Sequence, residues 1–128
     1  MKRILFLLSI FLFAGFIFTA LAQELRVITL DKDDGLLANP SRITLSPGDT
    51  LQFKSIDGDF AIYIQDAISF LRIKDVDLKI RVNSALNPES QMYIVKKVES
   101  DIDETYSIYC LTTNSWPDSP PRIIVLTY

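Results

Sequence analysis

The sequence has no histidine and only one cysteine, Cys110, among its 128 residues. Without histidine, neither a Ser-His-Asp nor a Cys-His nucleophilic arrangement can form, and zinc sites of the usual Cys/His kinds are excluded. A single cysteine cannot make an intrachain disulfide, so the fold must rely on its apolar core. With four glycines, the chain also has no phosphate-cradling glycine-rich loop. These absences predict a protein that is not an enzyme.

An excess of positive charge is also missing. The chain has a net charge of −3, and the two charges within the first 22 residues are both basic, so the remainder is still more acidic. Nucleic-acid binding needs clusters of Lys and Arg that neutralise phosphates. The composition therefore argues against nucleic acid as a partner, and against electrostatic binding to a membrane surface.

The first 22 residues have the layout of a secretory signal peptide. Met1-Lys2-Arg3 is a short basic start, 4–18 is a nearly unbroken apolar run, and Ala20-Leu21-Ala22 is a small-residue cleavage site. The alternative is a retained transmembrane anchor, because the run could just span a bilayer. Cleavage predicts an exported protein, periplasmic or secreted, with one mature domain at 23–128 and no membrane attachment.

The mature chain is a series of short apolar or alternating segments separated by turn signals. Strands are predicted at 25–30, 41–46, 50–54, 60–64, 78–82, 92–98, 104–110 and 123–126. A helical turn is expected within 66–75, and 99–104 is expected to be an acidic connector. Seven to nine short strands without a persuasive helix predict an all-β fold, an antiparallel β-sandwich.

Carboxylates are the most abundant chemical groups in the turns. The turn 31–35 has acidic spacing like that of a calcium loop, but its glycine is fifth rather than sixth and its twelfth position is Arg42. A solvated turn is the expected reading there, with calcium as the alternative. Acidic pairs for acid/base chemistry are available at two places, Asp57 with Asp59, and Asp101 with Asp103 and Glu104. Solvated charge is the preferred interpretation of both.

Three blocks of sequence resemble the cupredoxin family, the plastocyanin and azurin kind of protein. They are the strand-turn-strand 43–53 with its Pro-Gly-Asp turn, the segment 57–64, and the strand 104–110 that ends in Cys110. The resemblance implies a Greek-key sandwich, which makes the full fold prediction an antiparallel Greek-key β-sandwich of seven to nine strands, cupredoxin-like.

The same resemblance places the family's copper ligands on this chain. Cys110 matches the thiolate position, whereas Ala61 and Thr113 replace the two histidines, and the axial methionine falls near Asp118 or Ser119. A blue-copper site needs two imidazoles and a thiolate. The prediction is therefore a domain with no type 1 copper site and no cofactor, acting as a binding or structural module. The alternative is a small redox or thiol protein, or an enzyme, using Cys110 or an acidic pair.

The cysteine strand also predicts an interaction surface. Alternation places Tyr106, Ile108 and Cys110 on one face and Tyr109 on the other. Cys110 is then a packed residue, and Tyr109, Asn114 and Trp116 form a possible binding surface for an unknown protein or small ligand. For Trp116 itself, the preferred interpretation is that it caps the end of the sandwich and closes the space that a metal site would have occupied. Pairing of two copies through an edge strand or Cys110 is a further expectation.

Overall fold

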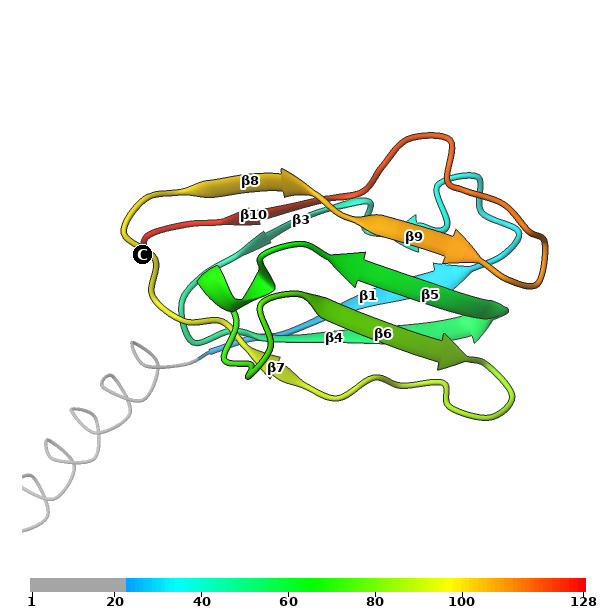
Figure 1. The fold of residues 1–128 in the computed structure, drawn as a ribbon, viewed down its shortest axis with the longest axis horizontal. Helices are drawn as coiled ribbons and strands as arrows, with labels where there is room; N and C mark the ends of the chain where they lie inside the picture. The colour runs from blue at the N-terminus through cyan, green and yellow to red at the C-terminus, as the bar shows by residue number, and fades with distance from the viewer. Residues whose placement is uncertain (1–22) are drawn as a thin grey trace, which may run out of the picture.

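The computed structural model describes residues 23–128 (Figure 1). The predicted signal peptide, 1–22, lies outside the described residues, so that assignment stays a prediction. Within 23–128, no helix has the length and apolar character needed to cross a membrane.

The described chain contains ten strands and one short 3-10 helix. In order they are β1 (Leu25–Asp31), β2 (Ala38–Asn39), β3 (Arg42–Leu45), β4 (Thr50–Asp57), β5 (Asp59–Ile64), η1 (Ala67–Ser69), β6 (Leu78–Asn83), β7 (Tyr93–Ile94), β8 (Ile102–Thr105), β9 (Ser107–Cys110) and β10 (Arg122–Val125). The number exceeds the predicted seven to nine because the two-residue strand β2 was not predicted and because the cysteine strand is divided at Tyr106 into β8 and β9.

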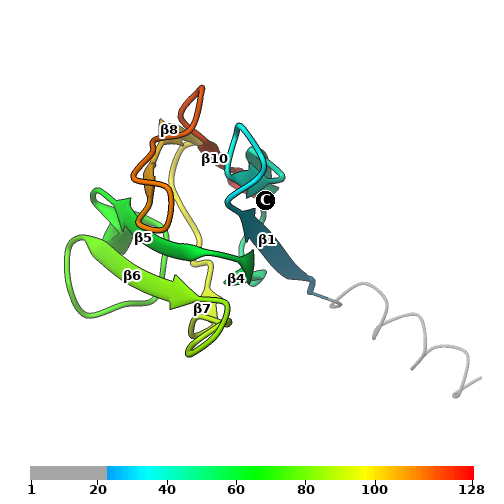
Figure 2. The same cartoon turned by 90° about the vertical axis from the view of Figure 1, so that its right-hand side faces the viewer.

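These strands form two layers. One layer is the sheet β2-β1-β4-β7. The other layer consists of two sheets, β3-β10-β8 and β6-β5-β9, which are connected because β8 continues into β9 through Tyr106. In the end view of Figure 2, β1 and β4 lie on the opposite side of the molecule from β5 and β6. The predicted all-β sandwich is confirmed. Its pairing is mixed, because β1 with β4 and β3 with β10 are parallel, while the other pairs are antiparallel.

Alternation along the strands fills the space between the layers. In β5, for example, Phe60, Ile62 and Ile64 are buried while Ala61 and Tyr63 are exposed. The largest fully buried side chains are Phe53, Phe60, Phe70, Ile28, Leu30, Ile43, Leu45, Leu51, Ile62, Leu71, Ile108 and Ile123. Burial of this apolar surface is the main stabilising contribution available to a domain without a disulfide.

The predicted Pro-Gly-Asp turn joins β3 to β4. The N–H of Asp49 donates to the carbonyl of Ser46 at 3.1 Å, and Gly48 takes a φ of 91°, which a side chain would disfavour. The buried Asp49 carboxylate accepts hydrogen bonds from the N–H groups of Ser46, at 2.9 Å, and Glu24, at 3.3 Å. This carboxylate therefore fastens the start of the described chain to the turn.

Two segments differ from the sequence-based expectation. The end of the expected connector 99–104 is part of a strand, β8, because Ile102 packs on the core and pairs with Val125. The expected strand 92–98 is regular only at β7, because the chain changes partners there: the N–H of Val95 bonds to Asp49, and that of Lys96 to Phe70. The helical turn expected within 66–75 is present as η1.

Candidate functional site

Cys110 ends β9 inside the sandwich. Its side chain is fully buried, and it pairs across the sheet with the equally buried Phe60. The chain then reverses in a tight loop, in which the backbone groups of Cys110 and Ser115 bond to each other at 2.9 and 3.1 Å and Asn114 has a φ of 51°. Cys110, Ile108 and Tyr106 are all buried, as the alternation predicts.

The positions that the resemblance assigns to the histidines do not gather around this thiol. Ala61 pairs with Tyr109 and is exposed, so it lies on the opposite face of the sheet from Cys110. Thr113 is exposed in the loop, where its hydroxyl lies 2.6 Å from that of Ser115. Asp118, near the axial position, is also exposed. Cys110 is therefore the one member of this set that faces the core.

Tyr109, Asn114 and Trp116 do come together. The rings of Tyr109 and Trp116 are 4.8 Å apart between centroids and tilted by 57°, and the Tyr109 hydroxyl lies 3.4 Å from the side-chain oxygen of Asn114. Trp116 is 65% exposed, so it does not plug the end of the sandwich. Of the two interpretations of Trp116, the structure supports the surface patch.

This patch borders a hollow of about 410 Å³ on the outer face of the β6-β5-β9 sheet. The hollow, here called the Trp116 hollow, is lined by Ala61, Ile62, Tyr63, Lys79, Ile80, Arg81, Ser107, Tyr109 and Trp116. It follows from alternation on three neighbouring strands: the small Ala61 on the central strand faces outward between larger side chains. Tyr63, Lys79, Arg81 and Ser107 were not predicted, because only the strand register places them beside Tyr109 and Trp116.

The Trp116 hollow has both positively and negatively charged side chains around it. Arg81 donates two hydrogen bonds to Asp59, at 3.1 and 2.7 Å. The hydrogen bond from Arg81 lowers the pKa of the Asp59 carboxyl below its ordinary value, and the same contact raises the pKa of Arg81. Lys79 lies 6.0 Å from the centre of the Tyr63 ring and is close enough to Asp77 to help lower the pKa of that carboxyl.

Asp77 fixes the side chain of Tyr63, one of the residues that line the Trp116 hollow. It accepts hydrogen bonds from the Tyr63 hydroxyl at 2.6 Å and from the N–H of Asp66 at 2.8 Å. The bond from Tyr63 is the main reason that the pKa of Asp77 is lowered, and it also raises the pKa of Tyr63. The position of the Tyr63 hydroxyl beside the hollow is thereby fixed.

The acidic pairs considered for acid/base chemistry have structural partners. Asp59 is held by Arg81, and Asp57 lies 3.6 Å from the ammonium of Lys32. Asp103 accepts from Arg122 at 3.0 Å, and Asp101 accepts from the N–H of Thr127 at 3.0 Å. These contacts account for Asp57, Asp59, Asp101 and Asp103 as elements of turns and surface ion pairs, while Glu104 is exposed on β8.

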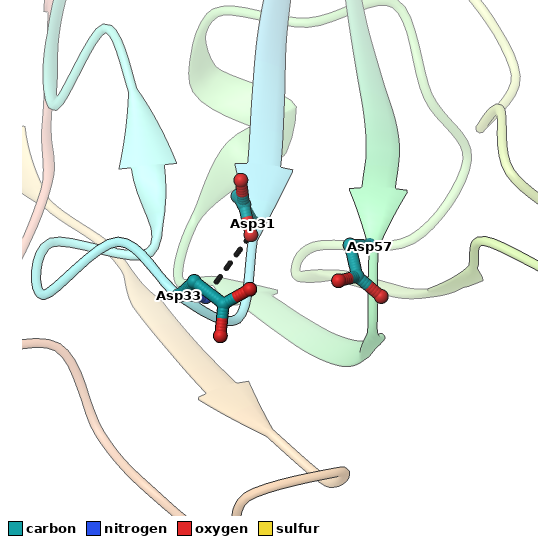
Figure 3. A group of neighbouring side chains, drawn as sticks. All are labelled: Asp31, Asp33 and Asp57. Carbon is teal, nitrogen blue, oxygen red and sulfur yellow. Dashed lines mark hydrogen bonds between the residues drawn. The ribbon is translucent and has the colours of Figure 1, made fainter.

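The acidic turn after β1 is joined by a third carboxylate (Figure 3). Oxygens of Asp31, Asp33 and Asp57 all lie within 4.8 Å of one another, because the parallel register of β1 and β4 places Asp57 beside Asp31. The ammonium of Lys32 lies 3.2 Å from Asp33 and 3.6 Å from Asp57. The group is thus a solvent-facing cluster that already contains a cation, and the hydrogen bond to Asp33 raises the pKa of Lys32.

Solved structures similar to this chain include those of amicyanin, a cupredoxin. A methionine-to-alanine variant in its Cu(I) form shares 15% identity at a TM-score of 0.47, covering 82% of this chain and 85% of amicyanin. A reduced tryptophan-to-tyrosine variant gives the same values. No protein-family model and no curated protein matches the sequence. At this similarity the matches carry no information about copper binding or electron transfer by this chain.

Proposed function

We propose that this chain is an exported, cupredoxin-like binding module without a type 1 copper site, and that its binding surface is the Trp116 hollow. The observation that carries the proposal is the position of Trp116. Its ring is 65% exposed, is supported by Tyr109, and stands at the edge of a hollow of about 410 Å³.

The donor set around the thiol is a poor match for copper. A type 1 site needs two imidazoles beside a thiolate, and the sequence has no histidine. Cys110 is fully buried, while Ala61 faces outward on the other side of the sheet. No other residue type in these positions supplies the missing imidazole nitrogens, so we assign Cys110 a packing role.

A binding role fits this surface better than a catalytic one. An exposed tryptophan leaves a large apolar area in water, and aromatic side chains of this kind are enriched at recognition surfaces. The nearby ionisable groups, Arg81 with Asp59 and Tyr63 with Asp77, are bonded to each other. They orient the walls of the hollow and leave no free carboxylate pair there. The partner is a protein or a small ligand encountered outside the cytoplasm, as the signal-peptide pattern of 1–22 predicts.

The purified protein titrated with Cu(II) and Cu(I) tests the copper-free part of this proposal. We expect no intense visible absorption from a thiolate-to-copper transition, and no rise in thermal stability at equimolar copper. The Cys110→Ala variant is the matched control for any weak nonspecific binding. A strong visible band that disappears in Cys110→Ala would overturn the proposal.

A further inference from the structure

We propose that the Trp116 hollow binds a neutral sugar. This inference rests on the proposed function, since it names the ligand class of the same surface. Three properties of the hollow carry it: an exposed aromatic ring of fixed orientation, charges that cancel locally, and polar groups that can both donate and accept hydrogen bonds.

The aromatic component is the indole ring of Trp116, which packs against Tyr109. Tyr109 packs against the indole at 4.8 Å and fixes its orientation, while 65% of Trp116 stays exposed. The face of an indole carries a negative quadrupole. The axial C–H groups of a pyranose form a weakly positive, apolar patch of matching size. A sugar ring can therefore lie on the indole without displacing Tyr109.

The electrostatic component argues for a ligand without net charge. Two cations, Lys79 and Arg81, line the hollow. Arg81 is paired with Asp59 at 2.7 Å, and a second carboxylate, Asp77, accepts a hydrogen bond from the lining residue Tyr63 at 2.6 Å. The formal charges of these four ionised groups sum to zero, so no net charge favours an anion or a cation. A neutral polyhydroxylated ligand fits such a surface.

The polar component is arranged around the apolar centre. Arg81 uses Nε and Nη2 toward Asp59, and its side chain is 69% exposed, so its remaining N–H groups are free to donate. The hydroxyl of Ser107, which also lines the hollow, is exposed. Sugar hydroxyls donate and accept, and so can use both the Arg81 N–H groups and the Ser107 hydroxyl.

The size and shape of the hollow agree with a small ligand. Its volume of about 410 Å³ lies in the range of roughly 300–1,000 Å³ that is typical of small-molecule sites. Its depth comes from Ala61, whose methyl group is the smallest outward side chain between Tyr109 and Arg81. A larger side chain at position 61 would fill the space that the sugar ring needs.

The test uses the fluorescence of Trp116, which is the only tryptophan in the chain. The purified protein is titrated with cellobiose, maltose and N,N′-diacetylchitobiose, at low and high salt. We expect at least one of them to shift the emission saturably and with little dependence on salt, since no net charge is involved. Glucuronic acid and a polyglutamate peptide serve as charged comparators.

Two variants locate the site. Ala61→Leu leaves the fluorophore in place and fills the floor, so binding should weaken about tenfold or more. Trp116→Ala should abolish binding. Because this variant lacks the fluorophore, its binding is measured by the amide chemical shift of Ser107. Leu86→Ala is the matched control, because Leu86 is 87% exposed but does not line the hollow; its affinity should stay unchanged.

Three results would overturn the sugar assignment: no saturable shift with any of the neutral sugars, a shift that Ala61→Leu leaves unchanged, or binding only of glucuronic acid or polyglutamate with loss at high salt. If one of the charged probes binds and Ala61→Leu abolishes that binding, the proposed binding surface stands and only the ligand class is wrong. A thiolate–copper band would instead contradict the proposed function itself.

Discussion

The hydroxyl of Tyr106 gives a prediction that separates hydrogen bonding from packing. Tyr106 lies between β8 and β9, is 4% exposed, and meets Phe53 edge to face at 5.9 Å. Its hydroxyl is buried and has no hydrogen-bond partner among the described residues. A buried polar group without a partner costs about 1–3 kcal/mol. Tyr106→Phe removes that cost and keeps the ring.

We expect Tyr106→Phe to raise the free energy of unfolding by about 1 kcal/mol. For a domain of this size, each kcal/mol corresponds to roughly 4–8 °C in the melting temperature. Tyr106→Ala is the contrasting variant: it also removes the ring that packs on Phe53, and it should cost about 3–5 kcal/mol. Urea denaturation followed by circular dichroism measures both.

The pH dependence provides an independent check. Burial raises the pKa of Tyr106 above its ordinary value of about 10. The unfolded chain therefore loses this proton first, and stability falls as the pH rises above about 10. Tyr106→Phe should remove part of that loss, so the stability gain over the wild type should widen with pH. A variant less stable than the wild type by more than about 1 kcal/mol at neutral pH would show that the hydroxyl is hydrogen-bonded in solution, and the reasoning would be wrong.

Three further predictions concern other parts of the domain. Cys110 is fully buried, so it should react with a thiol reagent slowly until denaturant is added, and Cys110→Ser should be about 1–2 kcal/mol less stable than Cys110→Ala because it buries a hydroxyl; rapid labelling of the native protein would contradict this. Asp49→Ala removes the acceptor for the N–H of Ser46 and should lower the free energy of unfolding by about 1–3 kcal/mol, measured by thermal unfolding. Asp49→Asn keeps one acceptor oxygen and should show only part of this loss. The pKa of Asp59 is lowered by Arg81, so the stability from this pair is present above the unfolded pKa of about 4 and is lost as the pH falls through the lower folded value; the difference between wild type and Asp59→Asn should therefore shrink in acid, and a constant difference would refute the pairing.

The sequence was sufficient for the strands whose pattern is local. The alternation in 60–64 and 104–110 predicted the buried and exposed faces of β5 and β9, and the Pro-Gly-Asp turn formed as predicted. In β4 the predicted inward residues Leu51 and Phe53 are buried, but so is Gln52 between them. Where the pattern depended on a distant partner, it was less informative. β8 carries three exposed polar residues around Ile102, and its pairing with β10 is what makes it a strand.

The candidate site shows the same division. Tyr109, Asn114 and Trp116 are close in sequence, and the chain reversal at Cys110 is enough to bring them together. The rest of the Trp116 hollow comes from β5 and β6, and their residues carry no local signature of a site. Asp57 likewise joins Asp31 and Asp33 only through the parallel pairing of β1 and β4.

By itself, the sequence determined the all-β class, the acidic surface, the absence of imidazole chemistry and the buried position of Cys110. These properties follow from composition and from a two-residue period, which each strand expresses independently. The tertiary structure alone decided that Ala61 faces away from Cys110 and toward Tyr109, and that Trp116 stands exposed over a hollow. These features depend on strand register and loop closure, which are fixed by contacts between residues far apart in the chain.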